Sequence, residues 1–375
     1  MVERRGTPPD TTDRTGSAVD PDDARPITPR LTWQRTLLLL ALLAGSFWFA
    51  LRNLDWNAVL EAIGTADPLW VLGVALIVLA AHLARAIRWR LFIPDGDKVP
   101  LSAAFDATII GYFANNLIPR SGELLRPWIL ARQQQAPTSR YLATIVVERA
   151  LDGLTLLAIL GMILLFAGDE LARLLAGIDG FEGISGGDLL VRLGLPMLVL
   201  LGLLAVIIFT PFGERILARV TGMLPERFAE KIMAGYREFR HGARLPDPVR
   251  RTPGILFWTG VIWTGYALSL YCGVVAFGFP ADFGLDFGDA VVILGITTIG
   301  VAIAPTPGGF GIFHSFARAT LAILYGVPVE IAVAFALVVH AAQYLVTMVV
   351  GGIVLVRRGR DLIPTRMQPE DPPTG

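Results

Sequence analysis

The chain has 375 residues, of which 54% are hydrophobic and 17% charged, and its formal net charge is zero. Apolar runs recur from Thr36 to Val356, and mean hydropathy is +0.58. This composition is typical of an all-α, polytopic membrane protein, and the zero net charge argues against a nucleic-acid partner. The single cysteine, Cys272, excludes an intramolecular disulfide and a cysteine-based metal site.

The two ends of the chain differ from its middle in composition. Residues 1–33 are rich in Pro, Thr, Asp and Arg and contain few large apolar side chains, which predicts a disordered tail. No small-residue cleavage site follows the first apolar run, so that run is expected to remain as an anchor. Residues 34–356 are predicted to form one transmembrane domain, and residues 357–375 a second disordered tail.

Six apolar runs have lengths near the ~17 to 25 residues that cross a bilayer core, the first being short. They are Thr36–Leu51, Pro68–Ala84, Thr144–Ala167, Leu193–Thr210, Ile255–Phe279 and Ile331–Val356. Basic residues concentrate before the first run, at 85–100, 119–140 and 211–251, and after Val356, whereas 168–192 and 279–289 are acidic. Since cytoplasmic loops collect Arg and Lys, this pattern predicts an inner-membrane protein with both termini in the cytoplasm.

Two further apolar runs lead directly into helix-breaking sequence. Leu101–Ile118 continues into "PRSGELLR", and Ala290–Ala304 continues into "PTPGGFGIFH". If Leu101–Ile118 crossed the membrane fully, the arginines of 119–140 would lie outside the cytoplasm. Every later loop would then lie on the side of the membrane opposite to the one that its charge favours. We therefore predict six full spans plus two oppositely oriented re-entrant hairpins, with a plain eight-span topology as the alternative.

The two predicted hairpins also resemble each other in sequence. "IIGYFANNLIPRSG" and "TIGVAIAPTPGGFG" share an Ile-Gly pair followed by proline and small residues. Opposite entry sides would make them an inverted repeat, an arrangement that many transporters use to bring broken helices together near the midplane. Non-helical backbone is tolerated at that depth only where protein or water covers it.

Residues 211–254 form an amphipathic cytoplasmic segment, with apolar residues at helical spacing among arginines. It is expected to lie on the inner-leaflet surface, where basic residues attract anionic lipid. An ordinary cytoplasmic loop obeying the positive-inside rule explains the pattern equally well.

Charged residues within the apolar run of "VVERALDG" are candidates for a functional site. Glu148 and Asp152 are four residues apart on one helix face, so their like charges require a cation between them. Arg149 is adjacent in sequence and is expected to point elsewhere. The predicted bridging group is Arg120 or Arg126 of the first hairpin, or a cationic group of the substrate. A structural ion cluster that locks two helices together is the alternative.

The first hairpin contributes further candidates. The side-chain amides of Asn115 and Asn116 can hydrogen-bond backbone groups that lose their partners where the helix ends. Pro119 ends the helix, and Gly122 permits close approach of another backbone or a positive φ. Arginine matches a pair of phosphate oxygens, whereas simple interfacial anchoring would also explain these basic residues. The candidate residues are Asn115, Asn116, Pro119, Arg120, Gly122, Glu123 and Arg126.

The second hairpin is rich in proline and glycine. A Gly-rich turn that starts a helix offers unpaired N–H groups to an anion, although the sequence matches no nucleotide-binding fingerprint. His314 could titrate near neutral pH or could be a hydrogen-bonded structural residue. His340, Gln343 and Tyr344 share one face of the last span and could line the same cavity. The candidates in the turn are Pro305, Pro307, Gly308, Gly309, Gly311 and His314.

The order of three motifs carries a family resemblance: N-x3-P-x2-G-E-x2-R at 115–126, V-E-R-x2-D at 147–152 and P-x-P-G-G-x-G at 305–311. Together they resemble the lysylphosphatidylglycerol synthase transmembrane-region family over residues 35 to 356. The resemblance implies a flippase-like inner-membrane protein that handles lipids. The family often carries an acid after the Gly-rich turn, where this chain has His314, so a shared cation site there is not implied.

We therefore predict a lipid flippase or transporter for anionic or aminoacylated phospholipids or related lipid-linked phosphates. A membrane enzyme acting on a lipid-linked phosphate and a secondary transporter of small solutes are the alternatives. The chain ends about twenty residues after its last span, so we expect no soluble synthase domain. No metal or cofactor is predicted. The expected partners are membrane lipids, with a homo-oligomer or a separate lipid-modifying enzyme as further possibilities.

Overall fold

The computed structural model describes residues 54–94, 98–175, 210–222, 226–243, 247–304 and 306–362, together with Trp48 and scattered residues between 185 and 206. Within these residues every regular element is helical and no strand occurs, which confirms the all-α prediction for this part of the chain. The predicted tail at 1–33, Pro305, all of the predicted span Thr36–Leu51 except Trp48, and more than half of the predicted span Leu193–Thr210 lie outside the described residues.

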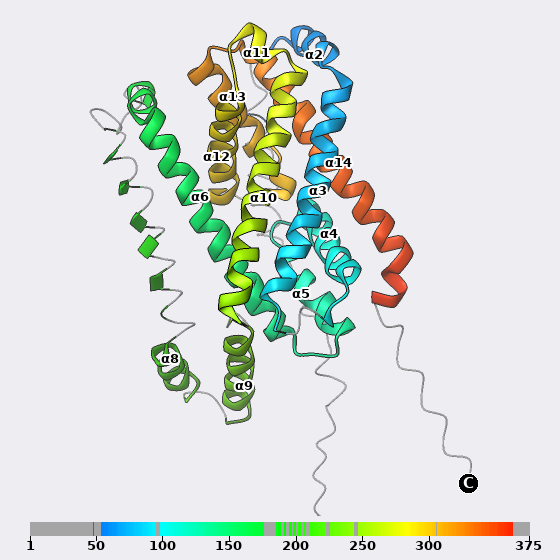
Figure 1. Ribbon diagram of the computed structural model, residues 1–375, viewed down its shortest axis with the longest axis vertical. Helices are drawn as coiled ribbons and strands as arrows, with labels where there is room; N and C mark the ends of the chain where they lie inside the picture. The colour runs from blue at the N-terminus through cyan, green and yellow to red at the C-terminus, as the bar shows by residue number, and fades with distance from the viewer. Residues whose placement is uncertain are drawn as a thin grey trace, which may run out of the picture. The chain divides into compact units, whose positions relative to one another are not determined.

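Long helices form the frame of the domain (Figure 1). Three described helices are long and apolar enough to cross a membrane: α3 (Pro68–Phe92), α10 (Pro248–Ala276) and α14 (Val329–Leu362). The fourth predicted span within the described residues, Thr144–Ala167, lies inside the 38-residue helix α6 (Thr138–Leu175). Several helices extend beyond the predicted apolar runs, and α14 continues past Val356 into the stretch where the sequence predicts a tail.

Local sequence explains where these helices begin. Asp67 precedes α3 and its carboxylate accepts from the backbone N–H of Leu69 at 2.8 Å, while Pro68 supplies a preset φ at the first helical position. Two short helices, α2 (Trp56–Thr65) and α11 (Phe279–Asp282), precede α3 and follow α10. The backbone N–H of Asp67 donates to the carbonyl of Ala276 at 2.9 Å and so joins the start of α3 to the end of α10.

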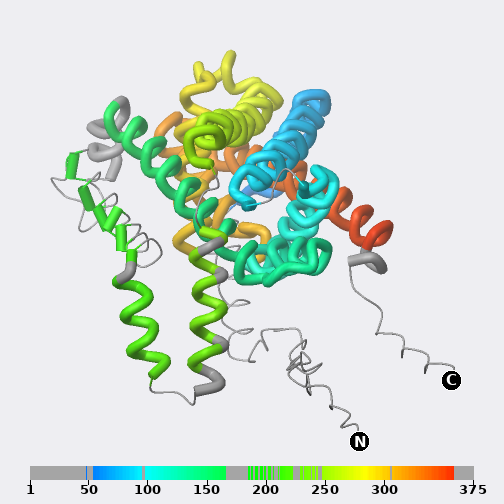
Figure 2. The backbone as a smooth tube through the Cα atoms, turned by 60° about the horizontal axis from the view of Figure 1, so that its bottom comes forward, coloured from blue at the N-terminus to red at the C-terminus, as the bar shows by residue number. Residues whose placement is uncertain are grey.

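The first hairpin consists of α4 (Leu101–Leu117), a short turn and α5 (Gly122–Gln133). Helix α4 ends before Pro119, as the sequence predicts, because proline lacks the N–H group that would continue the helix. The backbone reverses at Arg120, which has a left-handed φ of 60°. Helices α4 and α5 then pack against each other (Figure 2).

The second hairpin consists of α12 (Phe287–Ile303), the 3-10 turn η3 (Pro307–Gly309) and α13 (Ile312–Tyr325). Asp286 caps α12 by accepting from the backbone N–H groups of Gly288 and Asp289. Three glycines near η3 have positive φ, the conformation that other residues rarely adopt. They are Gly308, Gly309 and Gly311.

The predicted amphipathic segment is two helices, α8 (Pro211–Thr221) and α9 (Glu226–Ala243), that lie side by side (Figure 2). Arg240 of α9 pairs with Glu214 of α8 at 2.6 Å. Helix α9 packs on α6, where Ala243 meets Ala143 and Gly242 closely approaches the backbone of Arg140. One face of α9 therefore contacts protein.

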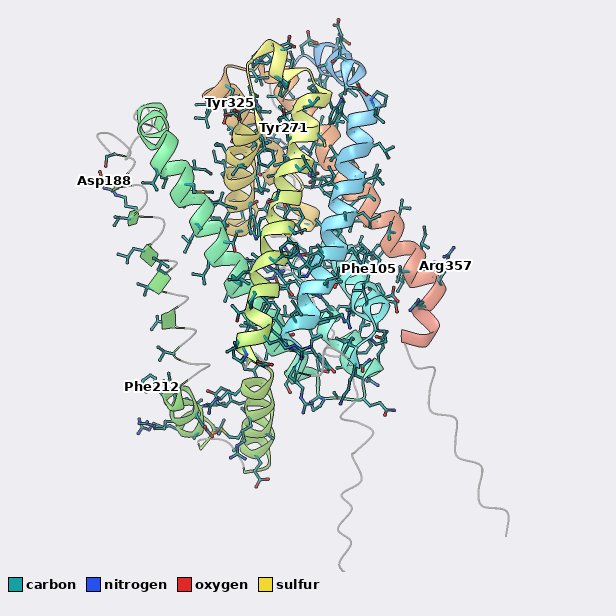
Figure 3. The ribbon with its side chains drawn as sticks, in the orientation of Figure 1. Phe105, Asp188, Phe212, Tyr271, Tyr325 and Arg357 are labelled. Carbon is teal, nitrogen blue, oxygen red and sulfur yellow. The ribbon has the colours of Figure 1, made fainter. Side chains whose placement is uncertain are left out.

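The packing of the domain positions both hairpins around one helix. Helices α3 and α10 lie alongside each other, and α14 contacts α4 of the first hairpin and α13 of the second (Figure 1). A large apolar core joins α2, α3, α10, α12, α13 and α14, and a second core joins α3 to α4, α5 and the start of α6. In Figure 3, Tyr271 and Tyr325 mark the end of the helices near α11, and Phe105 and Arg357 mark the opposite half.

Candidate functional site

Two acidic side chains of α6 lie at the centre of a buried ion cluster. Glu148 is 0% exposed and Asp152 8% exposed. Arg85 of α3 bridges them, with its Nη1 2.8 Å from Glu148 Oε1 and 2.7 Å from Asp152 Oδ2. Arg88, one turn further along α3, bridges them a second time through its Nη2 at 3.3 Å and 2.7 Å. The two carboxylates thus share two guanidinium groups from one neighbouring helix.

A cation does lie between Glu148 and Asp152, as the sequence predicts, but the bridging groups on the neighbouring helix are Arg85 and Arg88, whereas Arg126 of the first hairpin contacts Glu148 alone. Arg85 and Arg88 were attributed to a cytoplasmic loop, because the predicted span ended at Ala84. The helix continues to Phe92, and both arginines are buried, at 3% and 0% exposed. Residues three apart and residues four apart both lie on one face of a helix, so Arg85 and Arg88 can face the two acids. This spacing is the signal that could have identified the pair.

Two more arginines complete the cluster. Arg126 of α5 lies 3.1 Å from Glu148 Oε2 through its Nη2, so the predicted contact between the first hairpin and α6 is present. Its guanidinium carbon also lies 3.9 Å from the ring centre of Trp89, within the range of a cation–π contact. The expectation that Arg149 points away is wrong: its Nη2 lies 3.2 Å from Glu148 Oε1 and 3.1 Å from Asp152 Oδ2.

We call these six residues the arginine cluster: Arg85, Arg88, Arg126, Arg149, Glu148 and Asp152. Its four guanidinium groups face two carboxylates, so the difference is two positive charges. Buried charge in a membrane protein is unfavourable unless a partner balances it. The arrangement therefore favours an additional anion beside the cluster.

A pocket adjoins the cluster at the first hairpin. It contains about 290 Å³ of space, including its open mouth, between α4, α5 and α6. Arg126 and Arg149 line it, and the Nε atoms of both have no hydrogen-bond partner in the described part of the chain. Glu123 also lines the pocket, and four positive charges against three negative ones still leave one positive charge. The remaining lining residues are Thr108, Gly111, Tyr112, Asn115, Gly122 and Ile145.

Gly122 and Asn115 hold α4 and α5 close together at this pocket. The backbone N–H of Gly122 donates to Asn115 Oδ1 at 2.7 Å. A Cβ atom at Gly122 would overlap the carbonyl oxygen of Gly111, so close approach of α4 and α5, rather than a positive φ, explains Gly122. Small residues allow such approach between helices in membranes. Asn116 and Pro119 are partly buried in the same turn.

Arg120 does not bridge the acids, contrary to one alternative in the sequence analysis. Its Nη2 donates instead to the backbone carbonyl of Ala302, at the end of α12, over 3.3 Å. Helix α4 also contacts η3. The turn of the first hairpin therefore contacts the end of α12, and α4 contacts the turn of the second hairpin.

The turn of the second hairpin is held by its own hydrogen bonds. The backbone N–H groups of Gly309 and Phe310 donate to the carbonyls of Thr306 and Pro307, and that of Gly311 donates to His314 Nδ1 at 3.2 Å. These three N–H groups are therefore engaged within the turn, so of the N–H groups that the sequence predicts for an anion, these three are already paired. Pro305 lies outside the described residues, and Pro307 begins η3.

The last span supports this turn from the other side. His340 Nε2 lies 2.8 Å from the carbonyl oxygen of Gly308, and the ring of Tyr344 lies 4.8 Å from that of Phe310. Gln343 donates to Ser269 of α10 at 3.2 Å. The predicted polar face of α14 thus contacts the second hairpin through His340 and Tyr344 and packs on α10 through Gln343. Among the described residues, no three His, Cys, Asp or Glu side chains group together as a potential metal site.

Comparison with known proteins shows the family of this chain. The family model described as the lysylphosphatidylglycerol synthase TM region matches residues 36–351. The chain belongs to the lysylphosphatidylglycerol synthase transmembrane-region family. The match spans the arginine cluster and both hairpins, and it confirms that this is a membrane protein.

Curated relatives of this family member come from archaea. A UPF0104 membrane protein of Pyrococcus horikoshii is 24% identical over 80% of this chain and 90% of its own length. Another, of Methanocaldococcus jannaschii, is 20% identical over 86% of this chain and 95% of its own length. A protein of Haloferax volcanii named glycosyltransferase AglD is 24% identical over 87% of this chain, but the match spans only 55% of that relative. No solved structure gave a significant match.

Proposed function

We propose that this protein is a flippase-like transporter that binds the anionic phosphate of a lipid head group at the arginine cluster. One observation carries this proposal: four guanidinium groups, three of them buried, face two carboxylates beside a pocket, so positive charge exceeds negative charge in the arginine cluster. A phosphate in the pocket would balance that charge.

The chemistry of the pocket suits a phosphate oxygen pair. Arg126 and Arg149 line the pocket, each has a buried Nε without a hydrogen-bond partner among the described residues, and guanidinium groups bind phosphate through parallel N–H donors. The enclosed part of the pocket is only about 20 Å³, on the scale of a water molecule, so a head-group phosphate would enter as α4, α5 and α6 move apart while its acyl or isoprenoid chains stay in the bilayer.

The arrangement of the hairpins suits passage between leaflets. Helices α4 and α12 each have 17 residues, about 25 Å of helix, which is at the lower limit of the ~17 to 25 residues that cross a bilayer core. We therefore retain the proposal of two re-entrant hairpins that enter from opposite sides and meet at the contact of Arg120 with Ala302. In this topology both termini lie on the cytoplasmic side of the inner membrane. Parting of that contact would open a path for the head group.

Reconstitution tests this function with a matched control. We expect the wild-type protein in proteoliposomes to exchange fluorescent phosphatidylglycerol between leaflets, and Arg126→Gln and Arg149→Gln to slow exchange about tenfold or more. Each removes a charged hydrogen bond of about 1.5–3 kcal/mol. Arg132→Gln is the control, because Arg132 lies at the exposed end of the same helix as Arg126 and stacks on Trp128. Equal exchange in all four proteins would overturn the proposal.

An enzyme acting on a lipid-linked phosphate is the second candidate, since one relative is named as a glycosyltransferase. Against this function, the acids in the cluster, Glu148 and Asp152, already accept hydrogen bonds from arginine side chains, and Glu148 is fully buried. Incubation of the purified protein with a polyprenyl phosphate and candidate donors would test this function. A covalently altered lipid, with no leaflet exchange, would favour the enzyme.

A further inference from the structure

A buried histidine lies directly behind the pocket wall. His82 of α3 is 4% exposed, and its ring centre lies 4.3 Å from that of Tyr112, which lines the pocket. His82 is also one turn from Arg85 on the same helix. An ionisable side chain at this depth, next to a proposed anion site, is a candidate for a functional role.

Its hydrogen bonds indicate which ring nitrogen carries the proton. The hydroxyl of Thr347 donates to the backbone carbonyl of Gln343 at 2.9 Å, so its oxygen can accept from His82 Nε2 at 3.3 Å. The neutral ring is therefore protonated on Nε2. The other nitrogen, Nδ1, has no hydrogen-bond partner in the described part of the chain, which leaves a buried lone pair able to take a proton.

The groups around His82 make a second proton unfavourable without an anion. The charges that act on it are Arg85 of α3 and Arg126 of α5, both positive. Tyr112 of α4 faces the ring, Thr347 of α14 accepts its one hydrogen bond, and Tyr266 of α10 accepts from Arg85. Glu148 and Asp152 of α6 are already shared among four arginines. A phosphate in the pocket would add a negative charge that balances the positive charge of a protonated His82.

We propose that His82 takes up a proton when an anionic head group binds, so that the protein moves the anion and the proton together. This inference rests on the proposed function. Linkage makes the effect reciprocal: a bound anion favours the protonated ring, and a protonated ring favours the anion. Proton uptake then gives the transporter a means to use a proton gradient, with no covalent step and no other co-reactant.

The other buried histidines of the membrane domain provide a control. His314 Nδ1 accepts from the backbone of Gly311, and His340 Nε2 bonds the carbonyl of Gly308, so both hold the second hairpin. Neither lines the pocket at the first hairpin. Replacement of His340 should therefore leave proton uptake on lipid binding unchanged.

Calorimetry on the full-length protein in detergent tests the proposal. The probe is dioctanoyl phosphatidylglycerol, whose phosphodiester stays ionised where histidine titrates, between about pH 5 and 8. Titration in two buffers of different ionisation enthalpy reports protons taken up on binding. We expect wild type and His340→Gln to take up protons and to bind up to about tenfold more weakly per pH unit as pH rises. We expect His82→Gln and His82→Asn to bind without uptake or pH dependence.

Nitrogen-15 NMR of labelled histidine in the wild type gives a readout that needs no variant. Addition of the same lipid should convert one ring from the singly protonated Nε2–H form to the doubly protonated form. Binding without proton uptake in the wild type, or uptake that persists in both His82 variants, would overturn the inference but leave the transporter standing. Absence of any binding by the wild type would overturn both.

Discussion

Arg85 of α3 lies 2.7 Å from Asp152 of α6, although 67 residues separate them in the chain. The same guanidinium nitrogen contacts Glu148, so one buried arginine joins two carboxylates that would otherwise repel each other. The first test concerns what happens when one of these acids is removed.

Asp152→Ala should strongly destabilise the protein. It deprives Arg85, Arg88 and Arg149 of an ion-pair partner, and breaking a buried pair from one side costs about 3–5 kcal/mol. Unfolding in mixed micelles measures the loss of free energy. Glu214→Ala is the control, because Glu214 is partly exposed and its pair with Arg240 is worth about 0–1 kcal/mol. Equal losses would contradict the role given to the cluster.

Gly122→Ala should separate the helices of the first hairpin. The new Cβ would overlap the carbonyl oxygen of Gly111, so α4 and α5 must move apart and the pocket must change shape. We expect a lower unfolding temperature together with weaker phosphatidylglycerol binding. Gly161→Ala is the control, since nothing lies within 4 Å of its Cβ position and alanine is about 0.5–1 kcal/mol better than glycine within a helix. An unchanged Gly122→Ala protein would argue against tight hairpin packing.

Side-specific labelling should separate the hairpin topology from the eight-span alternative. In a Cys272→Ala background, Arg132→Cys and Arg237→Cys should react with an impermeant maleimide from the cytoplasmic side, in inside-out vesicles and not in intact cells. Ala281→Cys should react from the other side. All three positions are exposed and lie outside the three long spanning helices. Eight spans would reverse all three positions, so labelling of Arg132→Cys and Arg237→Cys from outside intact cells, with Ala281→Cys protected there, would support eight spans.

A cross-link between the hairpins should stop lipid exchange. In the wild type, Arg120 contacts the carbonyl of Ala302, and we propose that these two positions must part. A short bismaleimide that joins Arg120→Cys to Ala302→Cys would hold the two positions together. A matched pair, Glu214→Cys and Arg240→Cys, joins α8 to α9 and should leave exchange unchanged. Full exchange by the protein cross-linked between its hairpins would show that this contact does not gate the path.

Much of the helical framework could be predicted from sequence because its causes are local. Lipid forces each crossing segment to satisfy its own backbone, so apolar length marks the spans at Pro68, Ile255 and Ile331. Proline and glycine likewise mark the breaks near Pro119 and Gly308. The order of motifs also predicted the family that the comparison confirms.

The candidate site was only partly predictable. The sequence showed that Glu148 and Asp152 need a cation, since two acids one turn apart in an apolar helix repel each other. It could not show that Arg85 and Arg88 supply it, because a basic residue at the end of an apolar run is typical of a cytoplasmic loop as well as of a buried ion pair. It also did not predict that Arg149 turns back to both acids.

The sequence by itself therefore determined the class of protein, the described long helices, the two breaks and the need for buried charge to be balanced. Only the tertiary structure decided which arginines balance it, that the two hairpin ends meet, and that His82 lies behind the pocket. The physical reason is that hydropathy and helix breaking act within a few residues of the chain. Ion pairing and close approach instead depend on how α3, α5 and α6 pack across 22 to 67 residues of separation.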